Sequence, residues 1–149
     1  LHCSRFRRAK LMELARVLSC NKLALGHHLD DIAATLLMNM GQHGRFGGMA
    51  IRLDMTVGDL RYPLTMIRPL CYIAEQDIIE FTASHNYQPV KCRCEWGDTG
   101  FRKKSQRAVD VLAAISKDAR LNLLRAQFNY HTKHRQNTTN TPDIEDAQT

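Results

Sequence analysis

The stretch KLALGHHLDD, residues 22–31, joins a short apolar segment to a run of histidines and carboxylates. Residues 22–25 have the pattern of a buried strand that opens into a loop, as in an α/β layer. A helix is expected from Asp30 or Asp31 to about Met40, because acidic residues are favoured in a helix's first turn. Ligands of open α/β sheets lie at such carboxyl ends of strands, so this junction is the first candidate site.

The polar residues of this stretch suggest what the site would bind. Two adjacent carboxylates, Asp30 and Asp31, suit Mg²⁺ or polar ligand groups, and His27 and His28 can contact phosphate. The same string is also compatible with a solvated loop followed by an acidic helix cap. Both interpretations remain open at this point.

Helices and strands are predicted on both sides of the junction. Apolar spacing predicts helices over residues 7–18, 74–84 and 105–130, extended segments over 51–57 and 60–67, and a short final strand over 88–90. The order predicts an α/β fold, a partial sheet followed by a helical extension. Residues 132–149 hold almost nothing apolar, so we expect a disordered tail.

Length and composition exclude several classes of protein. The chain has 149 residues, enough for one domain, and its 44% apolar content is ordinary for a globular protein. No apolar run approaches the roughly 20 residues that cross a bilayer, and the first residues are basic rather than a secretory signal. We therefore expect a cytoplasmic protein with no membrane partner.

The net charge of +6 favours a phosphate-rich partner such as RNA, although a basic protein without such a partner fits equally well. The cations cluster near the N-terminus and again just after residue 100. Either cluster also fits a solvated helix surface. The candidate RNA contacts are Arg5, Arg7, Arg8, Lys103 and Lys104.

Five cysteines are an odd number for a disulfide framework, which we do not expect in a reducing compartment. Cys3 precedes a basic helix and Cys92 lies in a loop. With arginines nearby to hold thiolates deprotonated, the two could ligate an iron–sulfur cluster. Buried, inert thiols are the alternative.

Three strings together resemble one enzyme family. They are CSRFRR at residues 3–8, ALGHHLDD at residues 24–31 and IRPL at residues 67–70. They are similar to the tRNA 2-thiocytidine synthetase (TtcA) family of the PP-loop ATP pyrophosphatase superfamily, over about residues 1–112. The resemblance implies a PP-loop, adenine nucleotide alpha hydrolase-like fold with a parallel sheet, over residues 1–131.

The resemblance also implies a reaction. ATP would adenylate the C2 oxygen of cytidine 32 in the tRNA anticodon loop, and sulfur carried on a [4Fe–4S] cluster would then displace AMP. Partners would be tRNA, a sulfur donor such as a cysteine desulfurase, and a second copy in a homodimer. The implied roles are ATP and Mg²⁺ chemistry for Asp30 and Asp31, nucleotide binding for Gly26, His27 and His28, and cluster ligation for Cys3 and Cys92.

The chain departs from the family pattern in several ways. The phosphate-binding Ser-Gly-Gly-x-Asp-Ser loop is absent, and the first cysteine of the family's Cys-x-x-Cys would precede Leu1. Ala34 stands where the superfamily usually has Glu, and Cys94 is one residue too close to Cys92 for a second Cys-x-x-Cys. We therefore expect the C-terminal part of a longer enzyme, inactive by itself. Alternatives are 2-thiouridine synthesis, lysidine synthesis, or a non-catalytic RNA- or metal-binding fragment.

Overall fold

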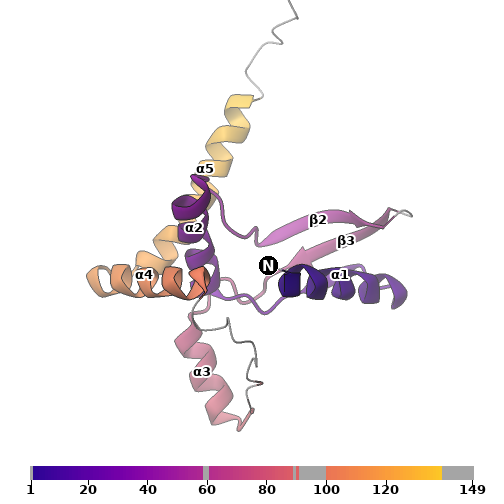
Figure 1. Ribbon diagram of the computed structural model, residues 1–149, viewed down its shortest axis with the longest axis horizontal. Coiled ribbons are helices and arrows are strands. Elements are labelled where there is room, and N and C mark those ends of the chain that lie inside the picture. The colour runs from indigo at the N-terminus through magenta and orange to yellow at the C-terminus, as the bar shows by residue number, and fades with distance from the viewer. Residues whose placement is uncertain (1, 59–60, 89, 91–99, 139–149) are drawn as a thin grey trace, which may run out of the picture.

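The computed structural model describes residues 2–58, 61–88, 90 and 100–138, with side chains described from Arg5 to Tyr130 within these ranges. Helices and strands lie close to the positions that the sequence predicts. In chain order they are α1 (His2–Val17), β1 (Lys22–Ala24), α2 (Leu29–His43), β2 (Arg52–Val57), β3 (Tyr62–Ile67), α3 (Glu75–Ser84), α4 (Phe101–Ile115) and α5 (Ala119–Thr138) (Figure 1). The expected α/β class is confirmed.

The sheet has the strand order β1-β3-β2 and is mixed rather than wholly parallel. β1 runs parallel to β3, with Leu23 opposite Met66. β2 and β3 are antiparallel, as a short turn between neighbouring strands requires. The strand expected over residues 88–90 is not found at Gln88 or Val90, and residue 89 lies outside the described residues.

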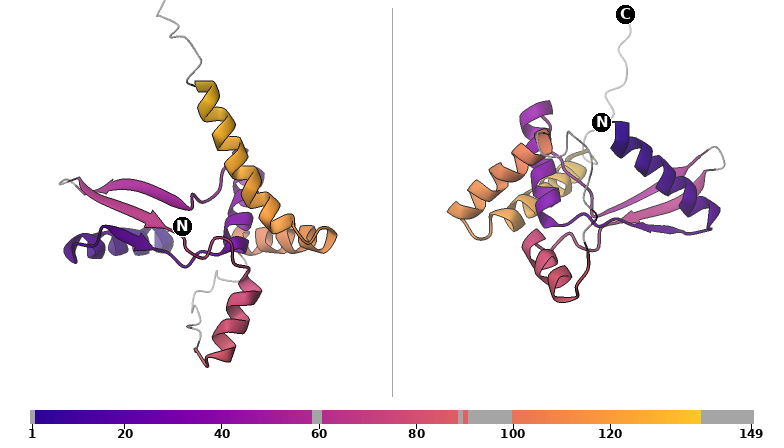
Figure 2. Two further views of the ribbon diagram at one scale, coloured as in Figure 1. Left: turned by 180° about the vertical axis from the view of Figure 1, so that it is seen from behind. Right: turned by 60° about the horizontal axis from the view of Figure 1, so that its bottom comes forward.

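One layer of the molecule consists of this sheet and α1, which contacts β1 and β2. Figure 2 shows α1 lying alongside the strands from two further directions. Leu64 and Met66 alternate along β3 and are buried, as is Ala15 of α1. The period of two therefore places one face of β3 in the core.

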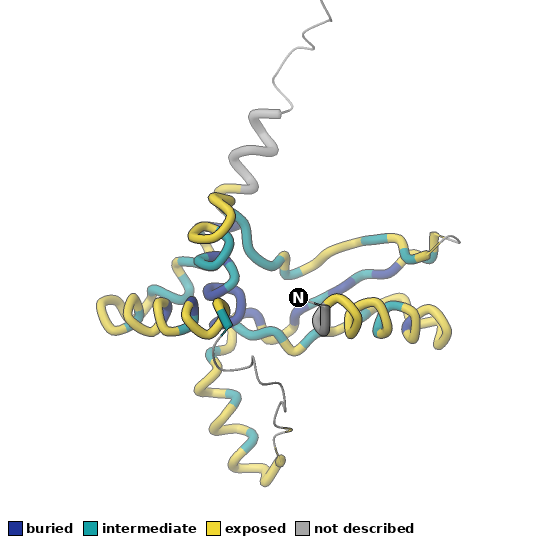
Figure 3. The backbone as a smooth tube through the Cα atoms, viewed as in Figure 1, coloured by how far each residue is buried: buried dark blue, intermediate teal, exposed yellow. Residues whose placement is uncertain are grey.

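A second layer consists of α2, α4 and α5, with α2 at its centre (Figures 1 and 3). Ile32 packs with Leu29, Cys71 and Leu124 in one buried cluster. Ala33 and Ala34 pack against Val109 of α4 in another. Small side chains let two helices approach closely, which explains an alanine at position 34 in this fold.

The C-terminal helical region differs from the expectation in two respects. The single pattern over 105–130 is two helices, because Ser116 adopts an extended conformation at the end of α4. α5 then continues to Thr138, so residues 132–138 are helical and not part of a disordered tail. Residues 139–149 lie outside the described residues. No helix in the described part of the chain is long and apolar enough to cross a membrane.

Candidate functional site

The candidate site lies where the parallel strands β1 and β3 end side by side. The Leu25 amide donates a hydrogen bond to the Ile67 carbonyl at 2.9 Å, so the loop after β1 begins against the end of β3. The loop carries Gly26, His27 and His28, and Arg68 follows β3 directly. The sequence predicted a ligand site at this edge, and the topology brings a histidine and an arginine together there.

His27 and Arg68 form the first contact of the site. Arg68 is 6% exposed, and its Nε donates to His27 Nδ1 at 3.3 Å. Its Nη1 donates to the carbonyl oxygen of Ala50. Burial lowers the pKa of His27, and the positive charges of Arg68, Arg102 and Arg8 act in the same direction. His27 is therefore an uncharged side chain among cations at neutral pH.

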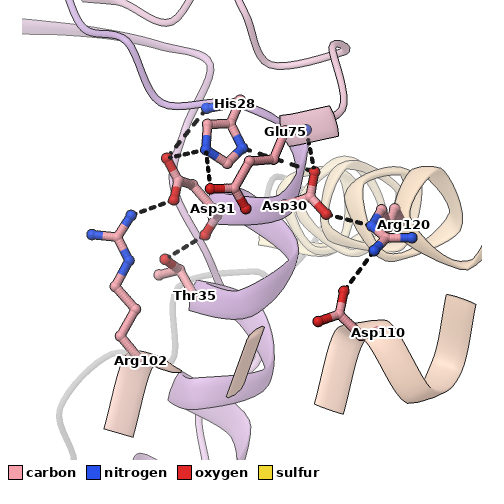
Figure 4. Close-up of polar contacts among 8 residues, drawn as sticks. All are labelled: His28, Asp30, Asp31, Thr35, Glu75, Arg102, Asp110 and Arg120. Carbon is pink, nitrogen blue, oxygen red and sulfur yellow. Dashed lines mark hydrogen bonds and ion pairs between the residues drawn. The ribbon is translucent and has the colours of Figure 1, made fainter. Parts of the chain in front are cut away.

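Asp30 lies in the first turn of α2 and is almost fully buried. Its Oδ2 accepts a hydrogen bond from the backbone amide of Glu75, at 2.8 Å, at the start of α3. Its Oδ1 accepts from Nε of Arg120 in α5, whose Nη2 donates to Asp110 of α4 at 2.6 Å (Figure 4). One carboxylate thus connects α2, α3, α4 and α5.

Asp31 is also buried, but its carboxylate contacts different elements. Arg102, at the start of α4, donates to its Oδ1 (Figure 4). Its Oδ2 accepts from the backbone amide of His28 at 3.4 Å, which satisfies a free donor at the N-terminus of α2. Thr35 donates to the Asp31 carbonyl oxygen at 2.7 Å.

The His28 ring lies among three carboxylates. Its Nε2 is 3.4 Å from Asp31 Oδ2 and 4.0 Å from Glu75 Oε1, and its Nδ1 is 3.8 Å from Asp30 Oδ2. Nδ1 is buried and has no hydrogen-bond partner among the described groups. His28 therefore belongs to the Asp30–Asp31 network, whereas His27 belongs to the Arg68 contact.

The expected magnesium role of Asp30 and Asp31 stays a prediction, because Mg²⁺ commonly binds one or two carboxylates together with substrate phosphates. Each carboxylate already accepts from an arginine and from a backbone amide. Among the residues that the structure describes, no group of three or more His, Cys, Asp or Glu could hold a metal ion. Both aspartates anchor the C-terminal helices to the start of α2 through ion pairs.

The other predicted site residues fall into two groups. Gly26 is exposed in the loop after β1, and the five predicted RNA contacts are exposed on α1 and on the first turn of α4. Lys103 also lines a shallow hollow beside Asp30 and Glu75. Cys3 lies in α1, but its side chain is outside the description, as is all of Cys92. The cluster-ligand prediction therefore stays a prediction.

Sequence reasoning missed Arg68, Arg102 and Arg120 as parts of the site. Arg68 stood within the IRPL string and Arg102 within the basic cluster after residue 100, so each carried a signal, though not for this role. Arg120 belonged to no motif. Only the packing of α5 against α2 brings it to Asp30.

Comparisons with known proteins agree with this fold. No protein-family model matches the chain. The chain is 37% identical over 134 residues to the tRNA-cytidine(32) 2-sulfurtransferase of Geobacter sulfurreducens, covering 89% of this chain and 51% of the relative. It is 40% identical over 101 residues to the Delftia acidovorans protein of the same name, covering 68% and 31%.

A solved structure shares the fold at lower sequence identity. The U34-tRNA thiolase NcsA from Methanococcus maripaludis, with its [4Fe-4S] cluster, superposes with a TM-score of 0.67 at 21% identity. The match covers 86% of this chain and 42% of the thiolase chain. The chain spans about half the length of the curated relatives. Over 89% of its own length the chain is therefore similar to curated tRNA-cytidine(32) 2-sulfurtransferases.

Proposed function

We propose that this chain takes part in the ATP-dependent thiolation of cytidine 32 in tRNA. The observation that carries the proposal is the 37% identity to proteins of that name over 134 residues, a stretch that covers 89% of the chain. The thiolase-like fold supports it. In the proposed reaction the cytidine C2 oxygen attacks the α-phosphate of ATP and releases pyrophosphate, and a sulfide then displaces AMP.

In this proposal, ATP lies at the edge formed by the Gly26–His28 loop and Arg68. Asp30 and Asp31 keep the loop in place through their ion pairs to Arg120 and Arg102. A contact of these carboxylates with ATP-bound Mg²⁺ is part of the same proposal. Their contribution is to orient the loop against α3, α4 and α5.

Cys3 and Cys92 are the proposed ligands of a [4Fe–4S] cluster, which supplies the sulfur when bound. The structural relative carries such a cluster. Cys3 lies on α1, the same helix as Arg8, whose charge acts on His27. A cysteine desulfurase is the proposed donor that restores the sulfur.

The tRNA is proposed to contact the exposed cations of α1 and of the first turn of α4. The charges of Arg8 on α1 and Arg102 on α4 both lower the pKa of His27, in the loop after β1. Cations in this position can bind the phosphates of an RNA beside the reacting base. The proposed contacts are Arg5, Arg7, Arg8, Lys103 and Lys104.

The test is an anaerobic thiolation assay. Because the relatives are about twice as long, the chain is assayed alone and joined to the part of the Geobacter sulfurreducens protein that it does not span. Purified protein is reconstituted with iron and sulfide and incubated with ATP and tRNA, and the digested nucleosides are identified by mass spectrometry. Absorbance and electron paramagnetic resonance report the cluster.

The proposal expects 2-thiocytidine from the joined protein, and loss of both product and cluster in Cys3→Ala and Cys92→Ala. Cys20→Ala is the matched control, since Cys20 is exposed and has no proposed role. Lysidine or 2-thiouridine as the product would contradict the proposal. Retained tRNA binding without any modified nucleoside would indicate a non-catalytic RNA-binding protein.

A further inference from the structure

We infer that Arg68 holds His27 in the tautomer with hydrogen on Nε2, so that His27 donates a hydrogen bond to a phosphate oxygen at the edge of β1 and β3. The inference rests on the proposed function, because it requires a phosphate-bearing substrate at this edge. His27 would contact the substrate directly, and Arg68 would be a positioning residue that acts through it.

The tautomer follows from the donor and acceptor chemistry of the two side chains. Arg68 Nε is 3.3 Å from His27 Nδ1, and a guanidinium can only donate. Nδ1 therefore accepts, and the hydrogen of the uncharged ring must lie on Nε2. The Nε2–H is therefore the ring group of His27 that can donate a hydrogen bond to a ligand.

The Arg68 side chain is itself fixed by several hydrogen bonds, so it can determine the tautomer of His27. Its side chain donates to the Ala50 carbonyl oxygen and to the sulfur of Met66, at 3.7 Å for the sulfur. Its backbone amide donates to the Ile51 carbonyl oxygen at 2.9 Å. A guanidinium that is buried and bonded to three groups cannot rotate away from the ring without breaking its bonds to Ala50 and Met66.

The surroundings of His27 favour an anion as the ligand. Besides Arg68, the charged groups that act on its ring are Arg8, Arg102 and Asp31, and the pKa of His27 is lowered by burial first and by these cations next. Asp31 is the only carboxylate among them and is already paired with Arg102. An uncharged N–H donor in a net positive environment suits a phosphate oxygen.

Two sources of phosphate fit this chemistry, a nucleotide and the RNA backbone. The carboxyl end of adjacent parallel strands is where open α/β sheets bind ligands, which is consistent with either source. The shared requirement is one phosphate oxygen within hydrogen-bond distance of His27 Nε2. The experiment therefore uses separate arms for the two sources.

The tautomer is read first, by nitrogen–proton correlation spectra of the imidazole rings in the ¹⁵N-labelled chain at pH 7.5. We expect a neutral His27 ring with hydrogen on Nε2. A ring with hydrogen on Nδ1, or a charged ring, would overturn the inference. This reading needs no variant, so it decides the question even where a substitution prevents folding.

Two variants then separate positioning from electrostatics. Arg68→Met removes the donor to Nδ1, and we expect the two neutral tautomers of His27 to become mixed. Arg102→Gln removes a nearby cation that makes no bond to Nδ1, and we expect the Nε2–H tautomer to persist. An unchanged tautomer in Arg68→Met would show that Arg68 does not position the ring.

The phosphate contact is tested with His27→Gln and His27→Asn. The Gln amide nitrogen lies near the place of Nε2, and that of Asn lies near Nδ1. We expect His27→Gln to bind inorganic phosphate nearly as well as the natural chain, and His27→Asn to lose roughly tenfold, the worth of one hydrogen bond to a charged group. Equal losses in both variants would overturn the contact.

The same variants are then titrated with AMP and with an anticodon stem-loop RNA to identify the source of phosphate. A selective loss for one of them assigns the phosphate to nucleotide or to RNA. The spectra require no catalysis. An Nε2–H tautomer with phosphate binding but no thiolation would contradict only the proposed function, and thiolation by a chain with the Nδ1–H tautomer would contradict only this inference.

Discussion

Asp30 and Asp31 are neighbours in the chain, yet their carboxylates contact different parts of the molecule (Figure 4). Consecutive residues of a helix are turned by about 100° from each other, so one faces α5 and the other the start of α4. Each carboxylate accepts hydrogen bonds from a guanidinium and from a backbone amide. These bonds offset the free energy that it costs to remove the charge from water. At the scale of the residue, the two carboxylates connect the start of α2 to the C-terminal helices.

The Asp30–Arg120 pair gives the first prediction. Arg120→Met leaves the buried Asp30 carboxylate without its cation, and we expect the free energy of unfolding to fall by about 2–4 kcal/mol. Asp110→Asn is the control, because Asp110 bonds the same guanidinium but its side chain is 65% exposed, so the loss should stay below about 1 kcal/mol. Urea denaturation measures both. Similar losses for the two variants would contradict the anchoring role of Asp30.

Two neighbouring glycines give a second prediction. A Cβ at Gly48 would lie 2.3 Å from Gln127 Oε1, whereas a Cβ at Gly47 would meet nothing within 4 Å. Gln127 is 2% exposed and also donates to the Met49 carbonyl oxygen at 3.0 Å, so it cannot move aside freely.

We therefore expect Gly48→Ala to destabilise the chain by about 1–3 kcal/mol, as overpacking does. Gly47→Ala should change the free energy of unfolding by less than about 0.5 kcal/mol. Thermal unfolding followed by circular dichroism compares the two variants. Tolerance of alanine at position 48 would mean that Gln127 can leave its place.

At the scale of the element, α4 packs on α2 through an apolar contact at Val109, in addition to the Arg102–Asp31 ion pair. Val109 is 1% exposed and packs against Ala33 and Ala34, while Val111 on the same helix is 62% exposed. We expect Val109→Ala to lower the free energy of unfolding by about 1–3 kcal/mol through the cavity that it leaves. Val111→Ala should have an effect within about 0.5 kcal/mol. Equal effects in denaturant titrations would contradict the packing of α4 on α2.

The position of Ala34 follows from the same contact. Ala34 is fully buried against Val109, and a longer polar side chain there would push α4 away from α2. A glutamate at position 34 would therefore be incompatible with this helix packing. The alanine is therefore a feature of packing in this chain.

At the scale of the whole molecule, His27 makes stability depend on pH. Its pKa is lowered from 6.5 in the folded chain, so between the folded value and 6.5 the unfolded chain binds more protons. The stability that comes from keeping His27 uncharged is present in full above pH 6.5 and is lost as the pH falls toward the folded value.

We expect urea midpoints to fall between about pH 7.5 and pH 5.5, and the fall to be smaller in His27→Gln, which cannot titrate. A urea midpoint that rises on acidification in the natural chain but not in the variant would contradict this prediction, because His27 would then contribute stability at low pH. That result would require a His27 that is charged in the folded state.

Sequence alone determined the elements and the place of the site. Apolar spacing located β3 and α3 within two residues of their observed bounds, because local periodicity follows directly from which face of an element is buried. The GHHLDD stretch marked the carboxyl end of β1 as the candidate site, and the structure places Arg68 beside it. These features depend on residues close together in the chain.

Tertiary structure decided what the site residues do. Asp30 meets Arg120 across 90 positions of sequence and Asp31 meets Arg102 across 71, and no local pattern encodes such pairs. The division of the C-terminal pattern at Ser116 is likewise seen only in the structure. The ion pairs, the tautomer of His27 and the role of the two aspartates follow from long-range packing, because it alone sets which charged groups lie within bonding distance.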